Sequence, residues 1–213
     1  MVDPPRMAKT HHQALTADQA RHFLDAVRDD PLEALYVLAI MTGMRQGELL
    51  GLHWQEVDLD AESLQIRSQL KRGGVLGFPK TDSSRRKIDL PAIAIEALRR
   101  QRVRQIHERF EAGAIWTESD LVFTNSVGNA INPANLRNRS FIPLLNKARL
   151  PIIRFHDLRH STATLLLSLE CNPKVVQELL GHSQIGVTMD VYSHALPTMQ
   201  KDAMSALNRL LTA

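Results

Sequence analysis

The feature that most constrains the fold is a single interruption of an otherwise helical pattern. Apolar residues recur every three or four positions along most of the 213 residues, which is typical of amphipathic helices. Between residues 57 and 90 this spacing gives way to alternation and to a Gly-Gly turn, which predict three short strands at residues 63–68, 75–78 and 86–90. We therefore predict a mainly α-helical α+β fold with one small antiparallel sheet.

Start and stop signals divide the rest of the chain into helices. Thr16 and Gln19 form a capping box, and prolines stand where several further helices are expected to begin. The expected helices cover residues 17–28, 32–41, 91–113, 132–148, a run from 156, residues 173–180 and a final segment from 197. Residues 1–13 show no apolar period, so we expect a linker or arm there and one domain over residues 14–213.

The charge and the cysteine content restrict the setting in which the protein works. The formal net charge is only +3, but Arg85, Arg86 and Lys87 fall together on the last predicted strand. Such a cluster is either a solvated face or a surface that follows a phosphate backbone, so these residues are candidate DNA contacts. The single cysteine excludes an intrachain disulfide, and no apolar run is long enough to span a bilayer. With no leader segment visible, we expect a cytoplasmic protein without a membrane partner.

The last third of the chain concentrates side chains that suit phosphate chemistry. His156, Arg159 and His160 stand at i, i+3 and i+4, so one helical face can present all three to a common point. His182 follows the expected end of the next helix, and Tyr192 comes ten residues later. A phenol that attacks a phosphodiester needs cations to offset the phosphate charge and a base to take its proton. This grouping indicates such a site.

A second arginine stands far from this group in the sequence. Arg45 and Glu48 are three residues apart on a short helix that begins after Gly43. Two interpretations stay open at this point: a surface ion pair, or a glutamate that positions a functional arginine near a helix start, where anions are favoured.

Together these motifs resemble the catalytic domain of the tyrosine recombinases, the phage-integrase family. The matching segments are residues 42–49 (TGMRQGEL), 79–81 with 84–86 (PKT and SRR), 156–160 (HDLRH), 180–183 (LGHS) and 191–194 (VYSH). The resemblance covers the chain from about Leu15 onward and implies that family's catalytic-domain fold. It departs from the family in one respect, because the usual N-terminal core-binding domain is not in the sequence.

The resemblance implies that Tyr192 attacks a scissile DNA phosphate and forms a 3′-phosphotyrosyl bond, with later strand exchange and religation that need no ATP. It implies that Arg45 and Arg159 hold the non-bridging oxygens, which their planar guanidinium groups suit. No metal or other cofactor is implied.

Three further roles follow from the same resemblance. Lys80 would protonate the leaving 5′-oxygen, and His156 would accept or assist the transfer of the tyrosine proton. His182 would donate a hydrogen bond to the phosphate, while Glu48 would support the site and not carry protons. His160 is left out of the catalytic set.

The resemblance also implies partners. Double-stranded DNA is the expected substrate, other recombinase protomers are expected to form a tetramer on it, and accessory DNA-bending proteins are possible additions. The final helix carries an apolar stripe of Leu207, Leu210 and Leu211, for which we expect a contact with a neighbouring protomer.

Three alternative functions stay open. A zinc hydrolase is suggested by the i, i+4 spacing of His156 and His160, although Asp157 stands where a His-Glu-x-x-His motif has glutamate. A type IB topoisomerase shares the tyrosine chemistry. An inactive DNA-binding module would keep the fold without the reaction.

Overall fold

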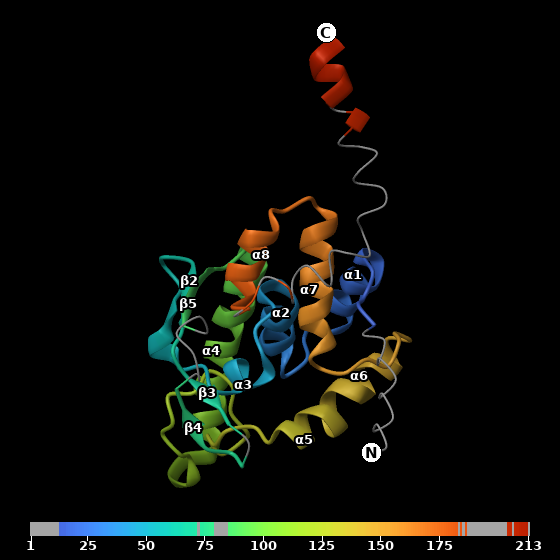
Figure 1. Cartoon of the computed structure of the whole chain (residues 1–213). Coiled ribbons are helices and arrows are strands. Elements are labelled where there is room, and N and C mark those ends of the chain that lie inside the picture. Colours follow the sequence, from blue (N-terminus) through green and yellow to red (C-terminus); the bar gives the residue numbers. More distant parts are fainter. Residues whose placement is uncertain are drawn as a thin grey trace, which may run out of the picture.

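A computed structural model describes residues 13–71, 73–78, 85–182, 184, 186, 204–205 and 207–212 (Figure 1). The helices are α1 (Ala17–Ala26), α2 (Glu33–Thr42), α3 (Gln46–Leu50), α4 (Ala92–Ala112), α5 (Pro133–Asn135), α6 (Ile142–Lys147), α7 (Asp157–Ser168) and α8 (Pro173–Leu180). The strands are β1 (Val57–Asp58), β2 (Ser63–Ile66), β3 (Gln69–Leu70), β4 (Leu76–Gly77) and β5 (Arg86–Asp89). The predicted mainly helical α+β fold is confirmed.

Helix α2 forms the centre of the domain and packs between α4 and α7 (Figure 1). All of its residues except Met41 are buried, and those between Glu33 and Thr42 at its two ends are mainly apolar, which is typical of a core helix. Tyr36 of this helix stacks on Phe141, and its hydroxyl group lies 2.6 Å from the Ser140 hydroxyl. The core therefore forms around a helix from the first quarter of the chain.

Local signals set the ends of the helices as expected. Thr16 and Gln19 form the capping box at the start of α1, and the Asn172 side chain caps α8. Gly43 and Gly181 end α2 and α8 in the left-handed conformation, with φ of 62° and 65°. Glycine adopts this conformation without steric cost, so both helices stop just before candidate site residues.

The strands form two separate sheets, and this corrects the prediction of one. β2 pairs antiparallel with β1 and with β5, whereas β4 pairs only with β3. The turn at Gly73 and Gly74, with φ of 91° and 79°, folds β4 back onto the segment just before it. The strand predicted at residues 75–78 therefore finds its partner in a short strand at 69–70, which the sequence pattern did not indicate.

The β3–β4 hairpin lies directly against α3 because two glycines allow a close approach. A Cβ atom added at Gly51 would lie 2.5 Å from the carbonyl carbon of Gln69, and one added at Gly47 would lie 2.7 Å from the Leu70 oxygen. Both distances are below van der Waals contact, so any larger residue must displace the hairpin backbone.

None of the helices in the described part of the chain has the length and apolarity needed to cross a membrane.

We expect Gly51→Ala to lower the free energy of unfolding by ~1–3 kcal/mol, because the new methyl group overpacks the α3–β3 contact. Urea unfolding followed by circular dichroism measures the change, with Arg99→Ala at an exposed position of α4 as the control. Equal stability of Gly51→Ala and the wild type would contradict the close packing.

Candidate active site

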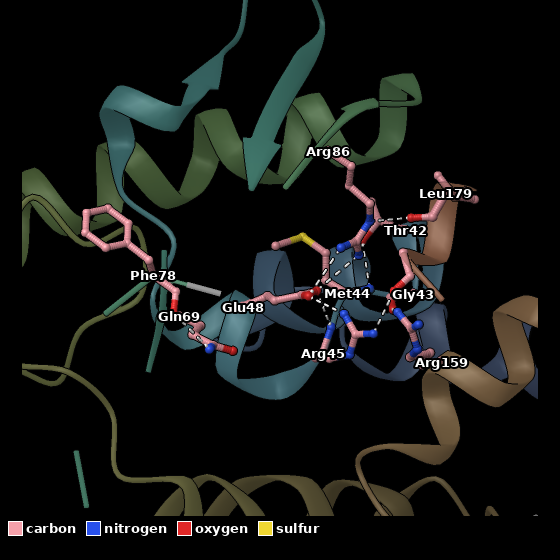
Figure 2. Close-up of polar contacts among 11 residues, drawn as sticks. Thr42, Gly43, Met44, Arg45, Glu48, Gln69, Phe78, Arg86, Arg159 and Leu179 are labelled. Atoms are coloured by element: carbon pink, nitrogen blue, oxygen red, sulfur yellow. Dashed lines mark hydrogen bonds and ion pairs between the residues drawn. The ribbon is translucent and has the colours of Figure 1, made fainter. Parts of the chain in front are cut away.

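Arg45 and Glu48 are joined by two hydrogen bonds at the start of α3 (Figure 2). The Arg45 backbone N–H donates to Glu48 Oε2 at 2.9 Å, and Arg45 Nη1 donates to Glu48 Oε1 at 2.6 Å. Glu48 is only 1% exposed, whereas the Arg45 side chain keeps 34% of its surface open. This excludes the surface ion pair, because the carboxylate is buried and holds an accessible arginine.

Arg86 reaches the same carboxylate from β5. Its Nη1 and Nη2 donate to Glu48 Oε1 and Oε2 at 3.2 and 3.1 Å, and its Nε donates to the Leu179 carbonyl oxygen at 2.6 Å. The sequence groups Arg86 with Arg85 and Lys87 as candidate DNA contacts. The structure instead places the Arg86 side chain inside the fold, only 7% exposed, because Glu48 needs a second cation there; its two neighbours are exposed.

The pKa of Glu48 reflects this arrangement. Burial alone would raise it, but the charges and hydrogen bonds of Arg86 and Arg45 lower it below its ordinary value. Glu48 is therefore a carboxylate at neutral pH. It is a fixed counter-charge to Arg86 and Arg45.

Arg159 is buried on α7, with 3% of its surface exposed. Its Nη1 donates to the Gly43 carbonyl oxygen at 2.8 Å, which ties α7 to the end of α2. Burial and the nearby Arg45 lower the pKa of Arg159 to about 9, so the guanidinium stays charged at neutral pH. Its buried Nη2 has no hydrogen-bond partner among the described residues. A buried cationic donor left unpaired is costly, so this atom favours an anionic ligand.

His182 follows the end of α8, where two arginines hold the backbone. Arg45 Nη2 donates to the Gly181 carbonyl oxygen at 2.8 Å, just after the Leu179 carbonyl oxygen that Arg86 binds. Burial, followed by the charges of Arg159 and Arg45, lowers the pKa of His182 to about 4. His182 is therefore neutral at pH 7 and can donate a hydrogen bond from one ring nitrogen.

His156 and His160 lie next to each other, as their i, i+4 spacing predicted. Their ring centroids are 5.0 Å apart in an edge-to-face arrangement. Although His156 keeps part of its surface open to solvent, desolvation, followed by the influence of His160 and Arg159, lowers its pKa to about 4, so the imidazole is neutral at pH 7. In the described residues no third ligating side chain joins this pair to form a metal site.

One supporting residue was missed by the sequence reasoning. Asp157 is buried at the first turn of α7 and accepts hydrogen bonds from the Arg154 backbone N–H at 2.9 Å and from Arg154 Nη2 at 2.7 Å. The pair holds the start of the helix that carries Arg159. The i, i+3 spacing of Arg154 and Asp157 was the available signal.

The described residues bring together Arg45, Glu48, Arg159 and His182 from α3, α7 and the end of α8, with His156 at the start of α7. Two predicted site residues, Lys80 and Tyr192, lie outside the described residues. Their roles therefore stay predictions.

A family model described as the phage integrase family matches residues 13–199. The chain belongs to this family. Among its curated relatives, a tyrosine recombinase XerC-like protein of Caldanaerobacter subterraneus subsp. tengcongensis is 33% identical over 97% of this chain and 56% of its own length. An integrase of Streptomyces ambofaciens is 33% identical over 90% of this chain and 52% of its own length. The chain thus spans about half the length of these integrase-family relatives.

Solved structures agree with the family assignment. The Tn1549 transposon integrase, bound to transposon right end DNA, superposes with a TM-score of 0.78 at 25% identity, over 94% of this chain and 67% of that one. The catalytic domain of bacteriophage HP1 integrase has a TM-score of 0.56 at 20% identity, over 90% of this chain and 93% of that one. The latter shows that the integrase catalytic fold accounts for nearly the whole chain.

The low pKa of His182 predicts a pH dependence of stability. Between pH 6.5 and about pH 4 the unfolded chain binds a proton at this residue that the folded chain does not, so acidification through this window destabilises the protein. We expect His182→Gln to lose less stability than the wild type between pH 7 and pH 5. Urea unfolding at both pH values measures this, with Lys174→Gln as an exposed control on α8; parallel curves for wild type and His182→Gln would disprove it.

Proposed function

We propose that this chain is the catalytic part of a site-specific DNA recombinase that cuts and rejoins DNA through a covalent tyrosine intermediate. The observation that carries the proposal is the buried Nη2 of Arg159, which has no hydrogen-bond partner in the described part of the chain and lies close to Arg45. Two guanidinium groups with an open donor suit a phosphodiester, in which two non-bridging oxygens share one negative charge. The family relatives, named recombinases and integrases, support the same reaction.

The cations of the site act mainly by electrostatics. Arg45 and Arg159 bind the non-bridging oxygens and offset the charge that develops in the transition state. Glu48 stays ionised and keeps Arg45 in place, as its buried position and short hydrogen bonds support. His182 stays neutral and donates a further hydrogen bond to the phosphate.

Proton transfer completes the reaction. Tyr192 attacks phosphorus, the bond to the 5′-oxygen breaks, and the DNA keeps a 3′-phosphotyrosyl link. His156, neutral at pH 7, accepts or assists the transfer of the phenol proton, and Lys80 protonates the leaving 5′-oxygen. Religation reverses these steps with a 5′-hydroxyl as the nucleophile, so no ATP is needed.

DNA and further protomers are the proposed partners. The exposed Arg85 and Lys87 next to the site suit contacts with the phosphate backbone. The Tn1549 integrase structure contains DNA, which supports the same substrate here. The cytoplasm is the proposed place of action. Four protomers on a pair of DNA sites would allow strand exchange, with DNA-bending proteins as accessory factors.

The first experiment tests for the covalent protein–DNA intermediate. Mixed with a nicked suicide DNA substrate taken from the flanks of its host element, the chain is expected to give an adduct on a denaturing gel, and Tyr192→Phe is expected to give none. Arg159→Ala should slow adduct formation by ~10²–10³-fold, the usual effect of losing one such donor. Supercoil relaxation without strand exchange would favour a type IB topoisomerase. DNA binding with no adduct, even with a relative's core-binding domain fused, would favour an inactive binding module.

The apolar stripe of the last helix predicts a protomer contact. Leu207, Leu210 and Leu211 are exposed by 45%, 77% and 74%, which suits burial against a second protomer. We expect a triple Leu→Ser variant to bind single DNA sites normally but to form fewer multi-protomer complexes in a gel-shift assay, with Asn208→Ala as the control. Unchanged assembly would refute the contact.

A further inference from the structure

We propose that Arg86 is a positioning residue for DNA cleavage: it holds Glu48 and the end of α8 so that Arg45 and His182 face the same phosphate. This inference rests on the proposed recombinase function. It replaces the expectation that Arg86 contacts the DNA backbone. Hydrogen bonds of Arg86 to the described residues Glu48 and Leu179, the burial of its side chain and the groups that these partners hold support this role.

The first step is the carboxylate that Arg86 shares with Arg45. Each Glu48 oxygen accepts one hydrogen bond from each arginine residue, with Oε1 bound by both Nη1 atoms and Oε2 bound by the Arg45 backbone N–H and Arg86 Nη2 (Figure 2). The four bonds fix the orientation of the carboxylate. Without Arg86, Glu48 would keep only Arg45, whose side chain is partly open to solvent. Arg86 therefore controls the orientation of Arg45 through Glu48.

The second step is the C-terminal end of α8. The last carbonyl groups of a helix lack partners within the helix, and cations are favoured beside them. Arg86 Nε binds the Leu179 carbonyl oxygen at 2.6 Å, and Arg45 Nη2 binds the Gly181 carbonyl oxygen at 2.8 Å. His182 is the next residue along the chain. The hydrogen bonds of Glu48, Arg45 and Arg86 therefore determine both the position of Arg45 and the position of the backbone that leads into His182.

The third step is the contrast with the neighbouring basic residues. Arg85 and Lys87 are exposed, whereas the Arg86 side chain is 7% exposed and all three of its nitrogen atoms donate within the fold. To contact a phosphate, Arg86 would have to release charge-assisted bonds to a buried carboxylate, which would then lose half of its compensating charge. A positioning role therefore fits the geometry, and a phosphate contact does not.

The test separates DNA binding from cleavage by comparing Arg86→Gln with Lys87→Gln. We expect Arg86→Gln to slow single-turnover adduct formation at saturating DNA by ~10–100-fold, the scale of a small misplacement of site groups. Its DNA affinity should keep the salt dependence of the wild type, whereas Lys87→Gln should lower the slope of log affinity against log salt by about 0.9, the value for one phosphate contact. Arg86→Lys should rescue cleavage only partly, since an ammonium group cannot span Glu48 and Leu179 as a planar fork does.

A double-mutant cycle tests whether Arg86 acts through Glu48. If it does, Arg86→Gln should slow cleavage much less in a Glu48→Gln background than in the wild type. Multiplying effects would overturn the inference, as would a lower salt slope with unchanged cleavage in Arg86→Gln. Circular dichroism at the assay temperature gives the folded fraction, and a rate loss that only follows this fraction would also overturn it.

Hydrogen exchange gives a readout that does not need DNA. The Gly181 and His182 amides donate to the Glu178 and Gln177 carbonyl oxygens at 3.1 Å each. We expect both amides to exchange faster in Arg86→Gln than in Lys87→Gln, and equal protection would contradict the hold on α8. Absence of an adduct with wild-type protein would count against the proposed function. If the wild type forms the adduct and Arg86→Gln forms it at the same rate, only this inference would be contradicted.

Discussion

The buried carboxylate of Glu48 is the interaction on which the site depends. A lone carboxylate at this depth would be strongly destabilising. Two guanidinium groups compensate it through three hydrogen bonds, and the Arg45 backbone N–H donates a fourth. These bonds join α3 to β5, and the same arginines continue to the carbonyl oxygens at the end of α8. Three elements that are distant in the sequence are therefore held around one negative charge, and the surplus of positive charge lies toward the candidate phosphate site.

Gly43 is the second constraint, because three helices meet there. It ends α2 with φ of 62°, its carbonyl oxygen accepts a hydrogen bond from Arg159, and a Cβ at this position would lie 2.4 Å from Leu180. Thr162 of α7 donates to the Ile40 carbonyl oxygen at 2.8 Å one turn earlier. The close approach of α7 and α8 to the end of α2 places Arg159 near Arg45. A Cβ at residue 43 would displace the Leu180 side chain, and the positive φ favours glycine there.

Burial gives the positive site its chemical character. The charges of Arg45, Arg86 and Arg159 reinforce desolvation in lowering the pKa of His182, so the imidazole remains neutral among cations. Arg159 keeps its charge at neutral pH because its pKa, although lowered, is still about 9. Its Nη2 has no hydrogen-bond partner among the residues that the structure describes, which leaves a donor for an anion. In the proposed reaction, the charged arginines would stabilise the phosphate, and the neutral histidines would donate hydrogen bonds or transfer protons.

The sequence by itself determined the local structure and the family. Capping residues, prolines and left-handed glycines act on the backbone within a few positions, so the helix limits and the motifs around Arg45, Arg159 and His182 were predictable from neighbouring residues. Only the tertiary structure decided that Arg86 points into the fold and that β3 and β4 form their own sheet. The physical reason is that burial of a charge depends on partners far along the chain: Glu48 is 38 residues from Arg86, and the Leu179 carbonyl oxygen is 93 residues from it. A basic triplet looks the same in the sequence whether its middle member meets water, DNA or a buried carboxylate.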